Sequence, residues 1–246
     1  MPIASNFTSV LYKDFEINFL QCAPNGMLKY TELCNLMQVA AATHSELGGI
    51  SFSDMQMFDQ AWVLSRMRVE ITKLPKWKDT ITIKTWIVSL ENSRSIRAIE
   101  VYLNDEKIVS SETFWAVMNT ETRRPEALAM RHEHFEKYPD VFATQQRVSK
   151  IDFDNATTLV NSRKVVFSDL DIVNHVNSMK YLEWCLDCLD LKIFMNQKLS
   201  SIDLNYLKEL SLDDAVEIRN ETFSNEIIFS VFKENKASFA LKLDFI

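Results

Sequence analysis

Cysteine is scarce in this sequence, and long apolar runs and an excess of basic residues are both missing. The cysteines are Cys22, Cys34, Cys185 and Cys188. They are too few and too scattered for a disulfide framework in a chain of 246 residues. No apolar run approaches the roughly 18 residues of a membrane-spanning helix. The net charge of −7 disfavours nucleic acid as a partner. We therefore expect a globular protein without disulfides, membrane spans or bound nucleic acid.

Two further absences concern metals and targeting. A zinc site that includes Cys185 and Cys188 would need two more ligands, and the sequence has no second Cys-x-x-Cys motif or paired histidine motif. We expect both thiols to pack in a core, with no metal and no cofactor. The first residues lack the basic and apolar regions of a signal peptide. The sequence thus favours a bacterial cytoplasmic location.

The most informative stretch that is present runs from Asp169 to Asn177 and gathers two carboxylates, a histidine and two asparagines. Apolar residues near helical spacing follow it, which predicts an amphipathic helix from about Met179 to Leu189. A carboxylate and an imidazole can move protons, and N–H groups at a helix start can face a developing oxyanion. The stretch therefore suits the activation of water. The alternative is an ordinary loop in which Asn177 or Ser178 caps the helix.

Three stretches of the sequence, residues 62–79, 110–124 and 168–181, resemble the acyl-[acyl carrier protein] thioesterases. These enzymes release fatty acids from their carrier in plant plastids and many bacteria. The resemblance extends from about residue 10 to residue 220. It implies an α+β tandem hotdog fold, in which two long helices are each wrapped by a curved antiparallel sheet and the sheets join side by side.

The resemblance also implies a set of catalytic residues. Asp171 and His175 fall on the family's Asp and His, and Glu209 falls on its downstream Glu. The family's Asn position holds Val173, and Asn174 stands one place later. Either Asn174 supplies the amide in a rearranged loop, or that contact is absent. We assign Asp171, Asn174, His175 and Glu209 as the candidate site, with Glu209 and His175 preparing the attacking water and Asp171 orienting them.

The function that the resemblance implies is hydrolysis of fatty acyl-[acyl carrier protein] thioesters in fatty acid biosynthesis. Leu210 stands where the family often has a cysteine, so a covalent cysteine route at that position is excluded. Two alternatives remain, an acyl-CoA thioesterase and a non-catalytic acyl-binding hotdog module. The sequence is also compatible with a homodimer.

An internal repeat can be read without any family. Aligning Lys29 with Lys180 gives an offset of 151, and aligning the later strand segments that begin at Val69 and Leu204 gives 135. The first half therefore carries about sixteen extra residues near 44–58.

The repeat supplies an internal control for the candidate site. In this alignment, the residues opposite Asp171, His175 and Glu209 are Leu20, Pro24 and Leu74. The polar trio thus occurs in one half only, which favours a single functional site over a role in folding.

Periodicity predicts one helix followed by strands in each half, an α+β order. In the first half we expect a helix over 31–47 and strands over 66–72, 81–88, 95–103 and 108–118. In the second half we expect strands over 201–207, 216–222, 227–233 and 237–245. The predicted domains are a first hotdog repeat over 1–130 on the acyl-chain side, a linker over 131–150 and a catalytic second repeat over 151–246.

The expected partner is an acyl carrier protein that bears a fatty acyl chain. Such carriers are acidic, and the chain itself has a net charge of −7, so docking needs a local basic patch. The candidate cations are Arg94, Arg97, Arg123, Arg124, Arg131, Arg163 and Lys164.

Overall fold

The computed structural model describes residues 3–196 and 198–246. The chain divides into two compact units. One contains the residues up to Ser65 together with Val69–Arg147, and the other contains Arg66–Arg68 and Val148–Ile246. None of the described helices is long and apolar enough to cross a membrane.

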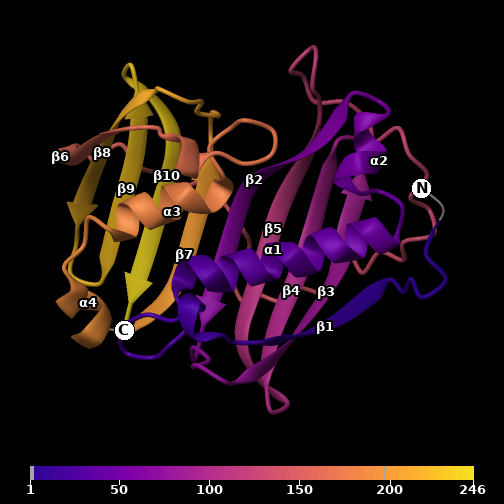
Figure 1. Cartoon of the computed structure of the whole chain (residues 1–246), viewed down its shortest axis with the longest axis horizontal. Coiled ribbons are helices and arrows are strands. Elements are labelled where there is room, and N and C mark those ends of the chain that lie inside the picture. The colour runs from indigo at the N-terminus through magenta and orange to yellow at the C-terminus, as the bar shows by residue number, and fades with distance from the viewer. Residues whose placement is uncertain (1–2, 197) are drawn as a thin grey trace. The chain divides into compact units, whose positions relative to one another are not determined.

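In the first unit, helix α1 (Tyr30–Leu47) lies across one face of an antiparallel sheet (Figure 1). Leu33, Met37 and Ala40 recur at helical spacing and are buried, which gives α1 its apolar side. The strands are β1 (Val10–Glu16), β2 (Gln60–Ile71), β3 (Thr80–Glu91), β4 (Arg94–Leu103) and β5 (Glu106–Asn119), in the spatial order β1-β3-β4-β5-β2. Two short helices, η1 (Phe19–Gln21) and α2 (Phe52–Gln56), flank α1 in the sequence.

The second unit has the same plan, with helix α3 (Ser178–Leu186) against its own antiparallel sheet (Figure 1). Its strands are β6 (Thr158–Lys164), β7 (Leu199–Tyr206), β8 (Ala215–Thr222), β9 (Glu226–Lys233) and β10 (Lys236–Phe245), in the order β7-β10-β9-β8-β6. The buried residues of α3 are Met179, Tyr181, Leu182, Trp184 and Cys185. The 3₁₀ turn η2 (Phe167–Asp169) precedes α3, and α4 (Leu191–Asn196) follows it.

The predicted α1 helix and the predicted strands are confirmed, with ends that differ by up to six residues. The predicted second helix is shorter than expected, because α3 ends at Leu186 with Asp187 as its C-cap. Strands β1 and β6 were not predicted. Six of the seven β6 residues are exposed, so its sequence lacks the alternation of apolar and polar residues that marks a half-buried strand.

The segment 131–147 runs without a helix or strand and is held to the first unit. The indole N–H of Trp86 donates to the carbonyl of Val141 over 3.0 Å. The carboxylate of Glu70 accepts the main-chain N–H groups of Gln145 and Gln146 at 2.7 and 3.0 Å. These bonds tie the middle of the segment to strand β3 and its end to strand β2.

The two units repeat one pattern of main-chain hydrogen bonds around the start of α1 and of α3. Leu28 N donates to Pro75 O over 2.8 Å, and Val176 N donates to Leu210 O over 2.9 Å. Ile17 N bonds Asp79 O just as Val165 N bonds Asp214 O, at 2.9 and 2.8 Å. These pairs confirm the internal repeat and the offset of 135 for the later segment.

For the earlier segment the same bonds give an offset of 148, so the predicted offset of 151 is wrong by three residues. The alignment of Lys29 with Lys180 was wrong because the turn before each helix fixes where that helix begins, and the two turns are 148 residues apart. The residues equivalent to Asp171, His175 and Glu209 are therefore Ala23, Met27 and Leu74. The predicted partners Leu20 and Pro24 are corrected, and the polar trio still occurs in one repeat only.

Candidate active site

A tight turn from Asp171 to His175 connects η2 to α3. Asp171 N donates to His175 O over 2.8 Å, and Asn174 N donates to Asp171 O over 3.0 Å. Asn174 has φ +63°, in the left-handed region where Asn and Gly are the favoured residues. Leu170 and Val176 form an antiparallel bridge at the base of the turn. The polar stretch of the sequence thus becomes a closed turn rather than an open loop.

The carboxylate of Asp171 holds this turn from within. Its Oδ1 accepts the main-chain N–H groups of Val173 at 3.0 Å and of His175 at 3.3 Å. Asp171 therefore acts on the main chain of His175, in an Asx-type arrangement. This fixes where the imidazole leaves the backbone.

Glu209 reaches the turn from the segment that follows β7. The main-chain N–H of Leu207 donates to Ser238 O over 2.9 Å, and Val176 N donates to Leu210 O, so this segment is bonded both to the sheet and to the base of the turn. As a result Glu209 Oε2 lies 3.6 Å from His175 Nε2. The two side chains are 36% and 30% exposed, so the pair can be reached from solvent.

A second carboxylate, Asp169, supports the turn from below and was not assigned from the sequence. It is almost fully buried, and it accepts hydrogen bonds from the Arg163 guanidinium at 3.0 and 3.1 Å and from the Trp184 indole at 3.2 Å. Its main-chain carbonyl accepts Asn177 N at 2.9 Å. The signal was present as the first carboxylate of the motif, but sequence alone does not separate an exposed carboxylate from a buried one.

The predicted helix cap is also confirmed. Asn177 is the N-cap of α3, and its Oδ1 accepts the N–H of Met179 over 2.9 Å. Tyr206 donates its hydroxyl to the carbonyl of Ser178 over 3.0 Å. Burial raises the pKa of the neighbouring Tyr181, which packs against Tyr206. The helix cap at Asn177 and the contact between His175 and Glu209 thus occur together, although the sequence alone left capping and a functional polar cluster as alternatives.

The remaining turn residues face outward. Ile172 is 88% exposed, and Val173 and Asn174 are exposed as well. The structure therefore brings the side chains of His175 and Glu209 together, whereas the Asp171 carboxylate bonds main-chain N–H groups of the turn. Asn174 is exposed, and its positive φ already explains why asparagine occupies this position.

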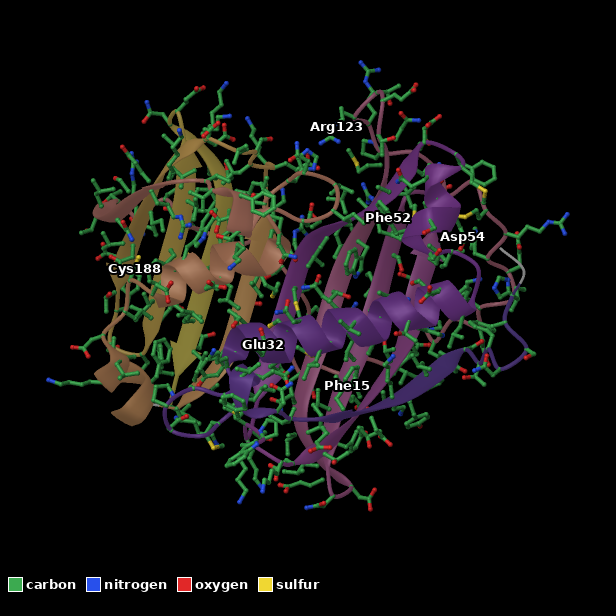
Figure 2. All side chains as sticks on the ribbon, viewed as in Figure 1. Phe15, Glu32, Phe52, Asp54, Arg123 and Cys188 are labelled. Carbon is green, nitrogen blue, oxygen red and sulfur yellow. The ribbon has the colours of Figure 1, made fainter. Side chains whose placement is uncertain are left out.

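Three of the candidate docking cations contact other groups of the protein, and one of them is Lys164, whose Nζ lies 2.8 Å from Asp213 Oδ1. Arg97 is buried and donates to His44 Nδ1 over 2.8 Å, so its selection as a docking residue is wrong. Arg163 is bonded to Asp169 and lies over the Trp184 ring at 4.2 Å. Arg123 lies at the turn after β5 (Figure 2), and Arg94, Arg124 and Arg131 are exposed as well.

Of the two cysteines expected in a core, Cys185 is buried there, whereas Cys188 is only half-buried. Cys185 is fully buried, which raises the pKa of its thiol, and Cys188 donates its Sγ–H to Trp184 O over 3.2 Å. Among residues 3–196 and 198–246, no three His, Cys, Asp or Glu side chains gather where they could hold a metal ion.

Models of two protein-family domains match almost the whole chain. The acyl-ACP thioesterase N-terminal domain matches residues 8–138, and the acyl-ACP thioesterase C-terminal domain matches residues 153–244. The chain belongs to the acyl-ACP thioesterase family, as its sequence motifs indicated.

Sequence relatives include two plant proteins. The chain is 28% identical over 223 residues to the chloroplastic palmitoyl-acyl carrier protein thioesterase of Arabidopsis thaliana, covering 85% of this chain and 54% of that protein. It is 26% identical over 228 residues to the chloroplastic oleoyl-acyl carrier protein thioesterase of Coriandrum sativum, covering 84% and 61%. The chain spans about half the length of the curated relatives that it matches first.

Solved structures establish the fold. An acyl-ACP thioesterase from Bacteroides thetaiotaomicron superposes with a TM-score of 0.89 at 22% identity, over 97% of this chain and 98% of that one. The 12:0-ACP thioesterase from Umbellularia californica gives 0.82 at 21% identity, over the same shares. The predicted α+β double hotdog is thereby confirmed.

Proposed function

We propose that the protein hydrolyses fatty acyl-[acyl carrier protein] thioesters to free fatty acid and carrier thiol in fatty acid biosynthesis. The observation that carries this proposal is the contact of 3.6 Å between His175 Nε2 and Glu209 Oε2 at a solvent-accessible turn. Family membership supplies the class of substrate, because the plant relatives are named for palmitoyl and oleoyl groups carried on acyl carrier protein.

The proposed reaction needs one proton acceptor and one donor to the carbonyl oxygen. The His175–Glu209 pair takes a proton from water as the water oxygen bonds to the thioester carbon. The carbonyl oxygen gains negative charge and is stabilised by a hydrogen-bond donor of the turn, either the Asn174 amide or a main-chain N–H. The carbon–sulfur bond then breaks, and the carrier thiolate leaves and takes up a proton.

Asp171 has a positioning role in this proposal. Its carboxylate holds the main chain of His175, so the imidazole faces Glu209 before the substrate arrives. The first repeat lacks the polar trio and is proposed to hold the acyl chain, with the division between the repeats near residues 131–150. The exposed cations Arg94, Arg123, Arg124 and Arg131 remain candidates for contact with the acidic carrier.

The decisive experiment measures free-thiol release from acyl carrier protein and CoA thioesters of graded chain length, with Glu209→Gln run alongside. We expect release from the carrier thioesters and a loss of at least about 100-fold in the variant, since a well-placed base contributes about 10²–10⁴ in rate. The matched control is Glu217→Gln, which removes another partly exposed glutamate from a pair with a cation, Arg219.

Each outcome separates the alternatives. Faster turnover of CoA thioesters keeps the chemistry and changes the donor. Tight acyl binding with no release from either donor makes the protein a binding module. A loss below about tenfold in a folded Glu209→Gln variant contradicts the assignment of Glu209 as part of the base.

A further inference from the structure

The hydrogen-bond donors of the turn can be counted one by one. From Asp171 through Asn177, every main-chain N–H except that of Ile172 already donates to an acceptor within the described chain. The carboxylate of Asp171 takes two of these donors, which makes both unavailable to a substrate. Ile172 N–H is left over in a residue that is 88% exposed.

The same turn occurs in the first repeat without the chemistry. There Ala23 N donates to Met27 O and Gly26 N donates to Ala23 O, both over 2.8 Å. These bonds match those of Asp171, Asn174 and His175, so Pro24 is equivalent to Ile172 and Gly26 to Asn174. Proline has no N–H. The free donor is therefore absent from the repeat that lacks the polar trio.

Asn174 has a sufficient explanation in the backbone. Gly26 has φ +78° and Asn174 has φ +63°, and these are the two residue types that the left-handed region favours. The amide of Asn174 is exposed, whereas its main-chain conformation closes the turn. A residue selected for its φ does not need an amide function as well.

We propose that the main-chain N–H of Ile172 donates to the thioester carbonyl oxygen, and that Asn174 is a positioning residue that holds the turn. This inference rests on the proposed function and names the donor that the mechanism left open. A main-chain donor in a turn fixed by six other main-chain N–H hydrogen bonds is preorganised, which is what stabilisation of an oxyanion requires.

The first repeat itself supplies the test substitutions. Ile172→Pro removes the N–H in a turn whose bonding pattern already accommodates proline at Pro24, and Ile172→Ala removes the side chain but keeps the N–H. Asn174→Gly removes the amide in a turn whose pattern accommodates Gly26. We expect Ile172→Pro to lower kcat by about 10²–10³, the range for loss of one oxyanion donor, with little change in KM. Ile172→Ala and Asn174→Gly should each lower kcat at least about tenfold less than Ile172→Pro does, because neither removes that donor.

Folding is checked by thermal unfolding and by crystal structures of the variants, in which the His175–Glu209 distance should remain near 3.6 Å. A kcat within about threefold for a folded Ile172→Pro variant overturns the inference, as does a loss of about 100-fold in Asn174→Gly, which would make the amide the donor. If Ile172→Pro does not fold, the measurement described next decides instead.

A second measurement does not depend on turnover. An acyl carrier protein whose thioester sulfur is replaced by CH₂ presents the carbonyl without being hydrolysed. On binding it should shift the Ile172 amide proton downfield in the spectrum of the ¹⁵N-labelled protein. Binding without that shift contradicts the inference and leaves the proposed function standing. Failure of the parent protein to hydrolyse any thioester would contradict the proposed function, whereas the shift would still support the donor.

Discussion

The turns Ala23–Met27 and Asp171–His175 share one backbone and differ in chemistry. Both close with the same pair of main-chain hydrogen bonds and both place a left-handed residue fourth. The first repeat has alanine and methionine at the ends of the turn, where the second has aspartate and histidine. The fold thus provides a rigid platform twice, and three side chains turn one copy into a candidate site. In the proposed function, the chemistry comes from side chains added to a repeated backbone.

The strongest test of this comparison is to remove the histidine and its counterpart in turn. We expect His175→Ala to lower kcat by at least about 100-fold, because it deletes half of the proton-accepting pair. The equivalent Met27→Ala should leave kcat nearly unchanged, because methionine carries no group that transfers a proton. Steady-state thiol release at saturating substrate measures both, and a similar loss in the two variants would contradict the assignment of the site to one repeat.

The buried histidine of the first repeat should respond to acid through stability. His44 is fully buried, and burial together with the charge of Arg97 lowers its pKa to about 3. Between about pH 6.5 and 3 the unfolded chain therefore binds a proton that the folded chain does not. The free energy of unfolding should fall as the pH drops through this window, by up to about 1.4 kcal/mol per pH unit.

Urea unfolding at several pH values measures this effect, with His44→Gln as the comparison. Glutamine can still accept from Arg97 but does not titrate, so the variant should lose less stability between pH 6.5 and 4.5 than the parent does. Identical pH slopes for the two proteins would show that His44 is not the group responsible. Above pH 6.5 the contribution of His44 to the slope should vanish.

Substitutions at Asp171 can distinguish a role in holding the backbone from a role of its negative charge. Asp171→Asn keeps Oδ1 as an acceptor for Val173 N and His175 N, so kcat should stay within about threefold of the parent. Asp171→Ala loses both bonds. We expect it to lower kcat by about tenfold, which corresponds to the roughly 0.5–1.5 kcal/mol of a hydrogen bond. In the first repeat the corresponding cap comes from Asn25 Oδ1, which accepts Met27 N at 3.0 Å. The double variant Asp171→Ala/Val173→Asn copies that arrangement and should recover part of the loss. Equal losses in the Asn and Ala variants would point to charge instead.

Helices and strands could be predicted from the sequence where the hydrophobic periodicity was strong, and they were missed where it was weak. Alternating apolar residues located β3, β4 and β5, and helical spacing located α1 to within one residue. Strand β6 is exposed over most of its length, and its pairing with β8 is set by hydrogen bonds that leave no apolar pattern. The predicted repeat offset of 151 was wrong for a related reason: the Lys-Tyr pairs at 29 and 180 are alike in sequence, but they do not occupy equivalent positions after the turn.

The candidate site residues could be proposed from the sequence, but the contacts that each of them makes could not. The resemblance to the family selected Asp171, His175 and Glu209, and the structure brings the last two to 3.6 Å. Sequence could not reveal that Asp171 bonds the main chain, that Asp169 is buried beneath the turn, or that Arg97 is sequestered by His44. Each of these depends on which way a polar side chain points, and the residue type alone does not reveal that orientation.

The smallest expected effect concerns the left-handed residue of the first turn. A Cβ at Gly26 would meet nothing within 4 Å, so Gly26→Ala is opposed by its φ of +78° alone. We expect the variant to lose about 1 kcal/mol in free energy of unfolding, whereas Gly26→Asn should lose less, because Asn tolerates this region better than Ala. Urea unfolding measures both, and kcat per folded molecule should be unchanged because this turn lacks the polar trio. If Gly26→Asn proves as destabilising as Gly26→Ala, then a preference for the left-handed region no longer accounts for asparagine at position 174. The Asn174 amide would then again be a candidate donor to the thioester carbonyl.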